Sequence, residues 1–525
     1  MPLRVSEVRV PVDGGDEVLL ARALRKAGLN DEDVTSLEVV RRSIDRRRAE
    51  PVFSFTVDLH LADESRGCVA AHGVERVAAP SPPEIPMGEE PLEHPPVVVG
   101  TGPAGMFAAL YLAQRGFRPI VLERGDRMNH RVAKIRDLNR DGALDPESNY
   151  LFGEGGAGTF SDGKLTSRSK DPRARWVLRE FRDRSGVPSV TWDHRPHLGS
   201  DRVRTVVGRI RQEILSLGGE IRFRCRVDRL RLRDGRVTGV VTSAGDVPAA
   251  VVVLAPGHSA RDLYRALHQQ EVAMVPKAFQ LGFRVEHPQS WVDTRVWGRF
   301  AGKPELGPAD YRLAVKARGA GVYSFCMCPG GEIIPAISDV GHMNTNGMSW
   351  SSRATGFANS GLVTTLEPES FPGEGPLAGV SWQERLEAHA AALAGGGLAV
   401  PAQRLQDWIQ GRPSDSLPST SCRTGLVPAP LRSVVPEQVD RLVRDVMGGI
   451  ERQMPGFLQE EALLVGPESR SSAPVRLVRD PRSLESPGTE GLLPVGEGAG
   501  YAGGIVSAAV DGLRAAEVIV ARYRA

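Results

Sequence analysis

The sequence predicts an α/β fold in which a Rossmann-type domain is interrupted by a mixed α+β domain and preceded by a small α+β module. Two glycine-rich segments almost 400 residues apart, 97–105 and 496–504, each follow a short apolar run and precede a helix-like run. The third observation is a proline-rich stretch that separates a strand-rich beginning from the first glycine segment. Together these features predict that distant parts of the chain complete one parallel sheet.

The composition is that of a large globular protein and excludes several classes. At 525 residues the chain is too long for a single hydrophobic core, which predicts about two to four domains. Its 66 basic and 64 acidic side chains leave a net charge of +2, so no global field draws it to nucleic acid or anionic lipid. A charged beginning and no run of about 20 apolar residues predict a cytoplasmic protein without a membrane partner. The five cysteines match no disulfide scaffold and no zinc-ligand spacing, so no metal site is expected.

The first 80 residues predict a separate β-α-β-β module, domain 1–80. Apolar and polar residues alternate as in strands, and a run with helical spacing lies between them. The expected elements are strands at 3–11, 37–44 and 52–61 and a helix at 16–28. Seven prolines from Pro80 to Pro96 disfavour a helix or a central strand, so residues 81–95 are predicted to form a linker.

Residues 96–275 are predicted to form the first part of the Rossmann-type domain. Val97–Val99, the helix-like 106–115 and the strand-like 119–122 make a βαβ unit around the first glycine segment. Further elements are expected as a helix at 205–217, a hairpin over 221–241 that turns at Asp234-Gly235, and a buried parallel strand at 251–254.

The middle of the chain differs from both flanks. Residues 276–367 alternate strand-like runs with Gly and Pro turns, and helices are expected at 382–395 and 436–453. We therefore predict a mixed α+β substrate domain over 276–460, after which the chain returns to the Rossmann-type domain over 461–525.

The first glycine segment has the spacing of a dinucleotide-binding turn. Gly100 permits a tight turn out of the strand, Gly102 lets the backbone approach a pyrophosphate, and Gly105 allows close helix packing. The helix that begins near Pro103 would direct free N–H groups at the phosphates. Glu123, at the end of the next strand, suits a ribose hydroxyl. On this segment alone, mononucleotide or NAD binding remains open.

The carboxy-terminal glycine segment favours FAD. Glu497 follows a short apolar run, where an acid can accept a hydrogen bond from a ribityl hydroxyl. The helix that starts at Gly504 and Ile505 can stabilise negative charge at the flavin N1/O2 edge on reduction. The loop at Gly156 and Ala157 can lie flat against an isoalloxazine ring, although an ordinary surface loop is the alternative. Because NAD needs no second segment of this kind, the two segments together predict FAD.

At this point the chain resembles the glutathione-reductase-like FAD proteins and, more closely, the bacterial FAD-dependent dehydrogenases of uncharacterised substrate. The resemblance covers nearly the whole chain. Its motifs are residues 148–165, 196–201, 285–288, 323–331, 345–349 and 496–512. It implies a glutathione-reductase-like FAD-binding Rossmann domain with an inserted substrate domain.

The same resemblance implies which residues hold the cofactor. The pyrophosphate would lie on 100–105, and the backbone of Val227 would contact adenine. Arg124 and Arg131 would be phosphate or adenine neighbours, and Gly257 would touch the cofactor. The expected cofactor-binding residues are therefore Gly100, Gly102, Pro103, Ala104, Gly105, Glu123, Arg124, Arg131, Gly156, Ala157, Val227, Gly257, Glu497, Gly504 and Ile505.

One loop departs from the family pattern. Where relatives have Ser-Tyr-Arg-Pro-Gly-Val, residues 421–426 are Ser-Cys-Arg-Thr-Gly-Leu, so an aromatic ring and a rigid turn are lost. If this loop lines the substrate cavity, the substrate would differ from the family norm.

The main candidates for catalysis are His197, Lys164 and Cys326. His197 suits proton transfer near neutral pH, although a lone histidine is more often structural, and the same holds for His287. Lys164 would place a positive charge near flavin N1 or a substrate carboxylate, and a solvated lysine is the alternative. Cys326 and Cys328, two apart in a strand, would face one side as a thiol pair, although buried cysteines are usually inert.

Three functions remain open. The first is a dehydrogenase or oxidase in which a hydride passes from a small organic substrate to flavin N5, and electrons leave to O2 or another external acceptor. No second strand-glycine-helix unit occurs, which argues against a built-in NAD(P)H domain. The second is a flavin-dependent monooxygenase that uses NAD(P)H and O2. The third is a flavin-containing RNA-modifying or scaffold protein, which the near-neutral charge disfavours.

Overall fold

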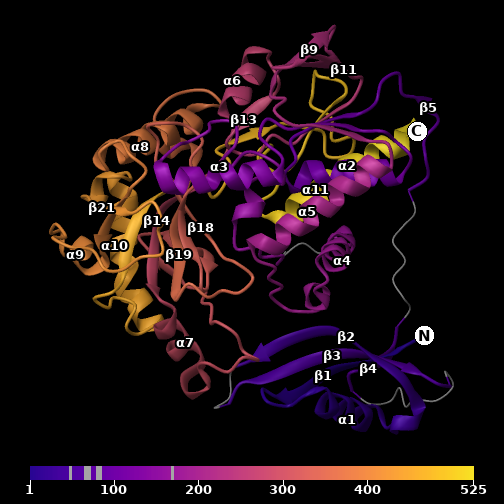
Figure 1. The fold of residues 1–525 in the computed structure, drawn as a ribbon, viewed down its shortest axis with the longest axis vertical. Helices are drawn as coiled ribbons and strands as arrows, with labels where there is room; N and C mark the ends of the chain where they lie inside the picture. Colours follow the sequence, from indigo (N-terminus) through magenta and orange to yellow (C-terminus); the bar gives the residue numbers. More distant parts are fainter. Residues whose placement is uncertain (47–49, 64–71, 78–84, 167–170) are drawn as a thin grey trace.

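Of the chain, the computed structural model describes residues 1–46, 50–63, 72–77, 85–166 and 171–525. A small sheet with one helix comes first, then a parallel sheet covered by helices, then a domain with a large, mostly antiparallel sheet (Figure 1). The chain finally returns to the parallel sheet. The predicted α/β fold with a Rossmann-type domain, a second domain and an amino-terminal module is confirmed. Residues 78–84, where the linker was predicted to begin, lie outside the described residues.

The amino-terminal module is a four-stranded sheet in the order β2-β3-β1-β4 with one helix packed on it. Its elements are β1 (Leu3–Pro11), α1 (Asp16–Ala27), a 3-10 helix (Asp31–Asp33), β2 (Val34–Asp45), β3 (Val52–Leu61) and β4 (Val74–Arg76). Leu3, Val5 and Val10 point into a core that Leu19 and Ala23 of α1 close. The predicted β-α-β-β order is present, and β4 is an added edge strand that the sequence did not predict.

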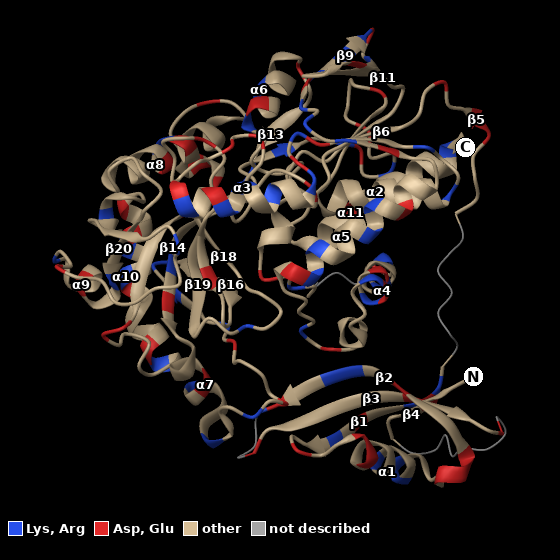
Figure 2. Cartoon of the chain, in the orientation of Figure 1, with Lys and Arg blue, Asp and Glu red and all other residues tan. Residues whose placement is uncertain are grey.

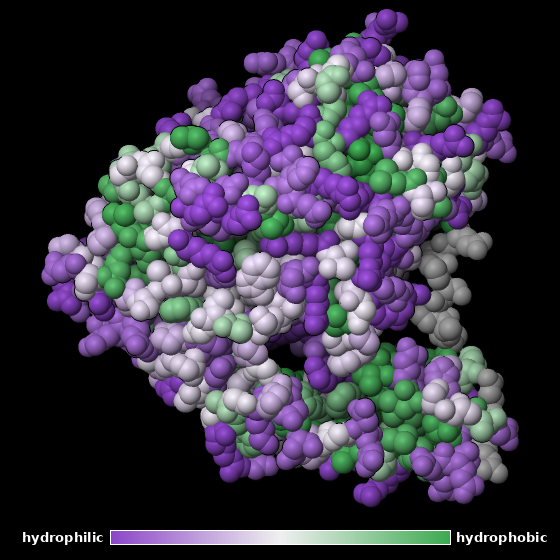
Figure 3. Space-filling view, viewed as in Figure 1, coloured by the Kyte–Doolittle hydropathy of each residue, from purple (hydrophilic) through white to green (hydrophobic). Residues whose placement is uncertain are grey.

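The module contacts the Rossmann-type domain near Arg42 and the second domain through a small hydrophobic cluster that joins Val12 and Phe53 to Leu306. The backbone N–H of Arg42 donates to the carbonyl oxygen of Trp192, and the Arg42 guanidinium lies 2.7 Å from the carboxylate of Asp193. The space-filling view shows an open gap between the amino-terminal module and the rest of the molecule (Figure 3). Basic and acidic side chains are mixed on most elements of the fold, as the near-neutral net charge suggests (Figure 2).

Five parallel strands form the Rossmann-type sheet in the order β24-β12-β6-β7-β8. They are β6 (Val97–Val99), β7 (Ile120–Leu122), β8 (Glu220–Arg222), β12 (Val252–Leu254) and β24 (Leu492–Pro494). Val98 and Val253 face one hydrophobic core, whereas Val97 and Leu254 face another on the opposite side. Burial on both faces explains why most of these strands are short uninterrupted apolar runs. The sheet that β6 begins is thus completed by a strand almost at the carboxy terminus.

Helices cover one face of this sheet. They are α2 (Pro103–Gln114), α4 (Arg173–Ser185), α5 (Ser200–Ser216) and α11 (Ile505–Arg522), which gather on one side in Figure 1. Helix α2 is apolar almost all round because α5, α11 and the sheet enclose it. A Cβ on Gly512 of α11 would lie 1.9 Å from the carbonyl oxygen of Ala104, so a glycine is needed where the two helices meet.

A three-stranded antiparallel sheet covers the other face. Its strands are β9 (Val227–Arg233), β10 (Arg236–Thr242) and β11 (Gly245–Pro248). Asp234 and Gly235 both have positive φ, which is the conformation that a two-residue hairpin turn requires. The hairpin starts at Val227 and not at residue 221 as predicted, because Glu220–Arg222 joins the parallel sheet.

The second domain is built on a seven-stranded sheet in the order β15-β16-β19-β14-β22-β20-β21. Its strands are β14 (Phe279–Pro288), β15 (Ala314–Ala317), β16 (Ala320–Cys328), β19 (Phe357–Leu366), β20 (Val400–Arg404), β21 (Leu426–Pro428) and β22 (Leu463–Glu468). Helices α8 (Ala378–Leu393) and α10 (Glu437–Gln453) pack against this sheet, close to the two predicted helices. Because β22 pairs with β14 and β20, this domain extends past the predicted boundary at residue 460.

The remaining elements are smaller. The remaining helices are α3 (Met128–Asp141), α6 (Arg261–Gln269), α7 (Gln289–Trp297) and α9 (Leu405–Gln410), with 3-10 turns at Ala157–Phe160, Pro188–Thr191, Gly298–Phe300, Pro368–Ser370 and Leu431–Ser433. Short ladders pair β13 (Met274–Pro276) with β23 (Val475–Leu477), β17 (Glu332–Pro335) with β18 (Thr345–Met348), and β5 (Glu90–Pro91) with β25 (Tyr523–Arg524). Within the described part of the chain, no helix is long and apolar enough to span a bilayer.

Candidate active site

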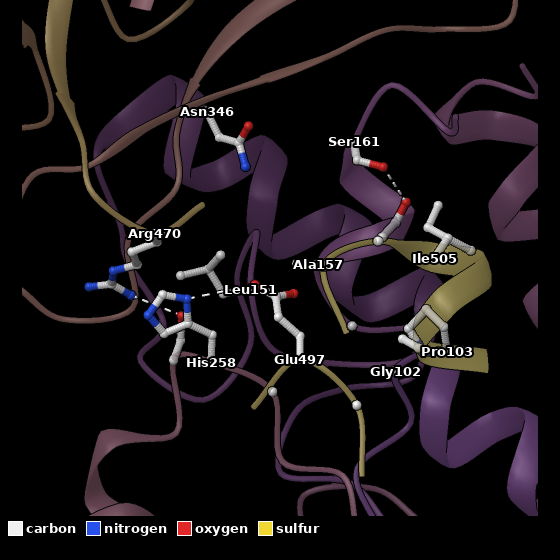
Figure 4. Close-up of a pocket in the computed structure, with 18 of the residues that line it drawn as sticks. Gly102, Pro103, Leu151, Ala157, Ser161, His258, Asn346, Arg470, Glu497 and Ile505 are labelled. Carbon is white, nitrogen blue, oxygen red and sulfur yellow. Dashed lines mark hydrogen bonds and ion pairs between the residues drawn. The ribbon is translucent and has the colours of Figure 1, made fainter. Parts of the chain in front are cut away.

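The carboxyl ends of the parallel strands meet at one edge of the sheet, and the loops that leave them lie together there. Gly100 follows β6, Glu123 follows β7, Gly257 lies beyond β12, and Glu497 lies beyond β24. All four residues line one cavity of about 940 Å³, at the upper end of the usual range of roughly 300–1,000 Å³ for small-molecule sites. Gly102 and Glu497 face the same space (Figure 4), so the two distant glycine segments converge as predicted.

The amino-terminal side of the cavity has the features of a phosphate cradle. Helix α2 begins at Pro103 directly after Gly102, so its free N–H groups and positive dipole end lie at the cavity. A Cβ on Gly102 would meet no atom within 4 Å, because this residue borders open space. Gly105 lies behind, where a Cβ would be 1.9 Å from the carbonyl oxygen of Gly100. Gly105 therefore serves helix packing, and Gly100, Pro103 and Ala104 line the cavity.

Glu123 is buried at the end of β7, and its carboxylate is engaged by the backbone of three loops. Oε2 accepts a hydrogen bond from the N–H of Thr101 at 3.0 Å, and Oε1 accepts from Gly125 at 2.9 Å and Gly153 at 3.0 Å. The side chain thus fixes the loops around the cavity that it lines. A bond to a ribose hydroxyl stays a prediction.

Arg124 also lines the cavity, and its charge is already paired. Nε donates to Glu147 at 2.8 Å, and Nη1 donates to Asp262 at 3.0 Å. Burial lowers the pKa of Arg124, but the two carboxylates raise it above its ordinary value. The guanidinium stacks 4.0 Å from the ring centre of Phe152, which gives this end of the cavity a flat wall suited to adenine. Contact with the cofactor stays a prediction.

Arg131 was predicted to neighbour a phosphate or adenine, and the structure corrects this. The residue lies in α3, is fully buried, and is not among the residues that line the cavity. Burial lowers its pKa to about 9. Its guanidinium donates, at 2.7–3.0 Å, to the backbone carbonyl oxygens of Asn149, Tyr150, Glu154 and Gly156. Arg131 therefore holds the glycine loop from the side away from the cavity. Sequence alone does not tell whether an arginine lies on that side of the loop or in the cavity.

The glycine loop forms a smooth wall between the starts of two helices. A Cβ on Gly156 would lie 3.0 Å from the Cα of Gly102, and a Cβ on Gly158 would lie 3.3 Å from Cγ1 of Ile505. Ala157 lies between them, near the beginning of α11 (Figure 4). Gly504 lines the cavity at the same place. A wall almost without side chains, beside a helix N-terminus, fits a flat ring that gains negative charge on reduction.

Other predicted cofactor residues lie on the facing wall. Glu497 Oε1 lies 3.7 Å from Nδ1 of His258, as the dashed line in Figure 4 marks. Within the described residues, Nδ1 of His258 is buried without a hydrogen-bond partner, which suits a site that a polar ligand completes. Val227 lines the cavity at the start of β9. These residues, the phosphate cradle and the smooth wall together fit FAD.

Lys164 and Cys326 line the cavity where it reaches the second domain. Lys164 Nζ lies 3.0 Å from Oδ2 of Asp162 and donates a hydrogen bond to the carbonyl oxygen of Met327. Burial lowers the pKa of Lys164, but the Asp162 carboxylate raises it above its ordinary value. Asp162 was not predicted, and its only sequence signal is its place two residues before Lys164.

His197 does not line the cavity, so its predicted direct part in proton transfer is corrected. Its Nε2 lies 3.3 Å from Oδ1 of Asp162, and Arg353 Nε donates to the same nitrogen at 3.3 Å. Burial lowers the pKa of His197 below its ordinary value in spite of the carboxylate. The imidazole therefore lies beside the Asp162 carboxylate and outside the lining of the cavity.

Arg470 lines the cavity as well and was not predicted. Its guanidinium and that of Arg261 both donate to the carboxylate of Glu387 at 2.6–2.9 Å. Arg470 Nη1 also donates to the hydroxyl of Ser259 at 3.1 Å, beside His258 (Figure 4). Glu387 is fully buried in α8, so this ion cluster ties the second domain to the loop after β12. No local pattern marks it, because its members are far apart in the chain.

The loop 421–426 was expected to influence the substrate if it lined the cavity, and it does not line it. Ser421 N–H donates to Glu286 at 3.2 Å, and Arg423 Nε donates to Glu332 at 2.8 Å. The loop therefore packs against the second domain away from the cofactor site. Its departure from the family pattern carries no conclusion about the substrate.

His287 is a structural histidine rather than a candidate for catalysis. It is buried, its Nε2 hydrogen-bonds with the carbonyl oxygen of Phe457 at 2.8 Å, and its ring centre lies 4.6 Å from that of Trp291. It is not among the cavity-lining residues. Burial lowers its pKa to about 4 from an ordinary value of 6.5.

We expect this histidine to make the protein acid-sensitive. Because the folded pKa lies below the unfolded one, stability is complete above pH 6.5 and is lost as the pH falls toward about 4, by about 3 kcal/mol. Chemical denaturation at several pH values gives the free energy of unfolding as a function of pH. His287→Gln should remove most of the loss between pH 6.5 and about 4, whereas His268→Gln, on the exposed side of α6, should keep it. Equal slopes in both variants and the wild type would refute the assignment.

Comparisons with known proteins agree with this geometry. Family models match as "FAD-dependent protein, C-terminal domain-like" over 278–471, "FAD dependent oxidoreductase" over 170–306, "NAD(P)-binding Rossmann-like domain" over 98–158, and a domain of unknown function over 2–60. An uncharacterized protein of Clostridium beijerinckii is 39% identical over 532 residues, which cover 100% of this chain and 99% of that protein.

The comparison with solved structures includes the following two proteins. A geranylgeranyl bacteriochlorophyll reductase-like protein from Thermoplasma acidophilum has a TM-score of 0.35 and 14% identity, covering 82% of this chain and 78% of its own. A glycine oxidase from Bacillus cereus has a TM-score of 0.32 and 12% identity, covering 81% of this chain and 97% of its own.

Proposed function

The chain belongs to the FAD-dependent oxidoreductase family, and from this premise we propose that it is a dehydrogenase or oxidase that takes a hydride from a small organic substrate. Its cofactor is FAD, which when bound supplies a hydride-accepting N5 atom. The observation that carries the proposal is that the cofactor cavity continues into the second domain. The lining residues there include Tyr311, Arg312, Tyr323, Phe325, Cys326, Asn346 and Arg470.

The charged groups of the cavity suit an anionic or polar substrate. Lys164 stays protonated because Asp162 lies 3.0 Å away, and Arg470 is held by the buried Glu387. Cations that buried carboxylates hold in place can orient a carboxylate or another acidic group of the substrate without reorganisation during the reaction. His197 supports Lys164 through Asp162 and is proposed as a positioning residue.

We further propose that electrons leave to O2 or another external acceptor. In the described residues, the five-stranded sheet is the one parallel sheet with more than two strands, so a second nucleotide-binding Rossmann unit is not present there. The proposed partners are therefore a small-molecule substrate and a diffusible acceptor, without nucleic acid or membrane.

An anaerobic reduction assay tests the proposal. Purified holoenzyme is mixed with panels of amino, hydroxy and other small acids, and loss of the oxidised flavin absorbance is followed without any pyridine nucleotide. Bleaching by one class of substrate alone supports dehydrogenation. Bleaching by NAD(P)H and by none of the organic compounds would overturn the proposal in favour of a flavin-dependent monooxygenase.

Lys164→Met is expected to slow substrate-driven bleaching by about 10²-fold, because it removes a fixed charge from the site of developing negative charge. The rate is expressed per bound FAD, so partial loading does not imitate the effect. Lys26→Met is the matched control, because Lys26 Nζ binds the carbonyl oxygen of Ser6 within the amino-terminal module. Equal rates for both variants would exclude Lys164 from the reaction.

A further inference from the structure

Strand β16 ends in an irregular turn that brings two cysteines to the cavity. The pairing of β16 with β19 shifts register between Phe325 and Cys328, and Cys326 has a φ of +42°. The alternation that was expected to place both sulfurs on one side is therefore broken. Instead the Cys328 thiol folds back and lies 3.2 Å from the carbonyl oxygen of Cys326. Cys326 lines the cavity, and Cys328 is fully buried behind it.

Two positively charged side chains donate hydrogen bonds to the backbone of this turn. Lys164 Nζ donates to the carbonyl oxygen of Met327, between the two cysteines, and Arg284 Nη1 donates to the carbonyl oxygen of Cys326 at 3.3 Å. A hydrogen bond with the Cys328 thiol lowers the pKa of Cys326, and Lys164 and Arg284 lower it further, against the effect of burial. The same hydrogen bond and burial raise the pKa of Cys328. The thiolate form is thus favoured at Cys326, and the thiol form is favoured at Cys328.

The surroundings leave little space for the inner thiol to move. A Cβ on Gly331 would lie 2.8 Å from the Cβ of Cys328, and a Cβ on Gly347 would lie 2.9 Å from its sulfur. The glycines at these positions therefore let Cys328 pack directly behind Cys326. This arrangement keeps the Cys328 side chain against the backbone of Cys326, the residue that lines the cavity.

The other described cysteines lack these features. Cys422 is buried, away from the cavity, and burial raises its pKa to about 11. Cys225 lines the cavity near the start of β9, where its thiol is 3.4 Å from the hydroxyl of Thr242. The turn at Cys326 is also reached by Lys164, which follows the smooth glycine wall that fits the flavin ring. The pair is thus placed at the flavin end of the site.

We propose that Cys326 and Cys328 are a redox-active dithiol that exchanges two electrons with bound FAD. In the oxidising direction the Cys326 thiolate and the Cys328 thiol form one S–S bond, and the S–H bond of Cys328 breaks. Two electrons and the proton from Cys328 reduce the flavin, so atoms and charge balance. The reverse transfer opens the disulfide. The proposal needs FAD binding but does not depend on which organic substrate is oxidised.

Counting electrons tests this directly. Air-oxidised holoenzyme is titrated anaerobically with dithionite, and the flavin absorbance gives the FAD content. The wild type is expected to take up about four electrons per FAD, because a disulfide is a two-electron couple in addition to the flavin. Cys326→Ser and Cys328→Ser should take up about two. Cys422→Ser is the matched control and should behave as the wild type.

A second readout uses the wild-type chain alone, so it does not depend on the folding of any variant. The protein is denatured with iodoacetamide before or after reduction, and the peptide that contains residues 326–328 is weighed by mass spectrometry. An internal disulfide before reduction and two alkylated cysteines after it are expected. Two electrons per FAD in the wild type, with both cysteines alkylated in the oxidised protein, would overturn the proposal. Because dithionite is the reductant, this outcome is independent of whether the proposed substrate oxidation is correct.

Discussion

Gly102→Trp is expected to yield folded protein that carries almost no FAD. A Cβ at this position would meet no atom within 4 Å, because the residue borders the cavity directly before α2, so an indole there occupies the space of the pyrophosphate. The backbone is not strained, since Gly102 has a φ of −65° and an added Cβ has no neighbour within 4 Å. The measurement is the ratio of flavin to protein absorbance after purification, followed by reconstitution with added FAD.

Thermal stability gives an independent check of the same variant. FAD at about 100 times its Kd should stabilise the wild type by about 2.7 kcal/mol and leave Gly102→Trp unchanged. Gly397→Trp is the matched control, because that glycine also has no neighbour within 4 Å but lies in an exposed loop after α8. A Gly102→Trp protein as yellow as the control would show that the cofactor does not pass this residue.

Glu387→Ala is expected to destabilise the second domain by about 3–5 kcal/mol. Removing this carboxylate leaves the guanidinium groups of Arg261 and Arg470 buried without their shared partner. Burial alone would raise the pKa of Glu387, but the two arginines hold it well below its ordinary value, so the charged pair persists at neutral pH. Chemical denaturation of the purified holoenzyme measures the loss.

The control for this prediction lies on the same helix. Glu384 pairs with Arg265, whose side chain is 45% exposed, and a surface ion pair contributes at most about 1 kcal/mol. Glu384→Ala should therefore leave the midpoint almost unchanged. Similar midpoints for the two variants would mean that the buried cluster does not stabilise the domain. Because Arg470 lines the cavity, Glu387→Ala should also weaken substrate-driven flavin reduction per bound FAD.

Much of the fold followed from local patterns. The apolar runs at Val97–Val99 and Val252–Leu254 became central parallel strands, because strands buried on both faces need no alternation. The hairpin turn at Asp234 and Gly235 was recognisable from its residue types alone. The domain boundary at residue 460 was wrong because β22 is a buried apolar strand in either domain, and only its partners β14 and β20 assign it.

Some residues of the candidate active site could likewise be predicted from local sequence, and others could not. Glycine spacing placed Gly100, Gly102 and Glu497 around one cavity, since glycines at fixed intervals after a strand have few other uses. Charged residues were less predictable. Arg131 proved to be fully buried behind the loop it was expected to complement, and His197 lies behind Asp162. The neighbouring sequence of an arginine or a histidine is the same whether its side chain enters the cavity or packs behind the loop.

Local sequence was enough to locate the βα units, to indicate which coenzyme they suit, and to show that distant segments must join to hold it. Those features depend on residue periodicity and backbone freedom within a few positions of each glycine. Which side chains reach the cavity and which charges are buried as pairs became known only from the three-dimensional packing. Glu387 with Arg261, and Lys164 with the turn at Met327, become neighbours only after the two domains pack, because burial and electrostatic pairing depend on residues far apart in the chain.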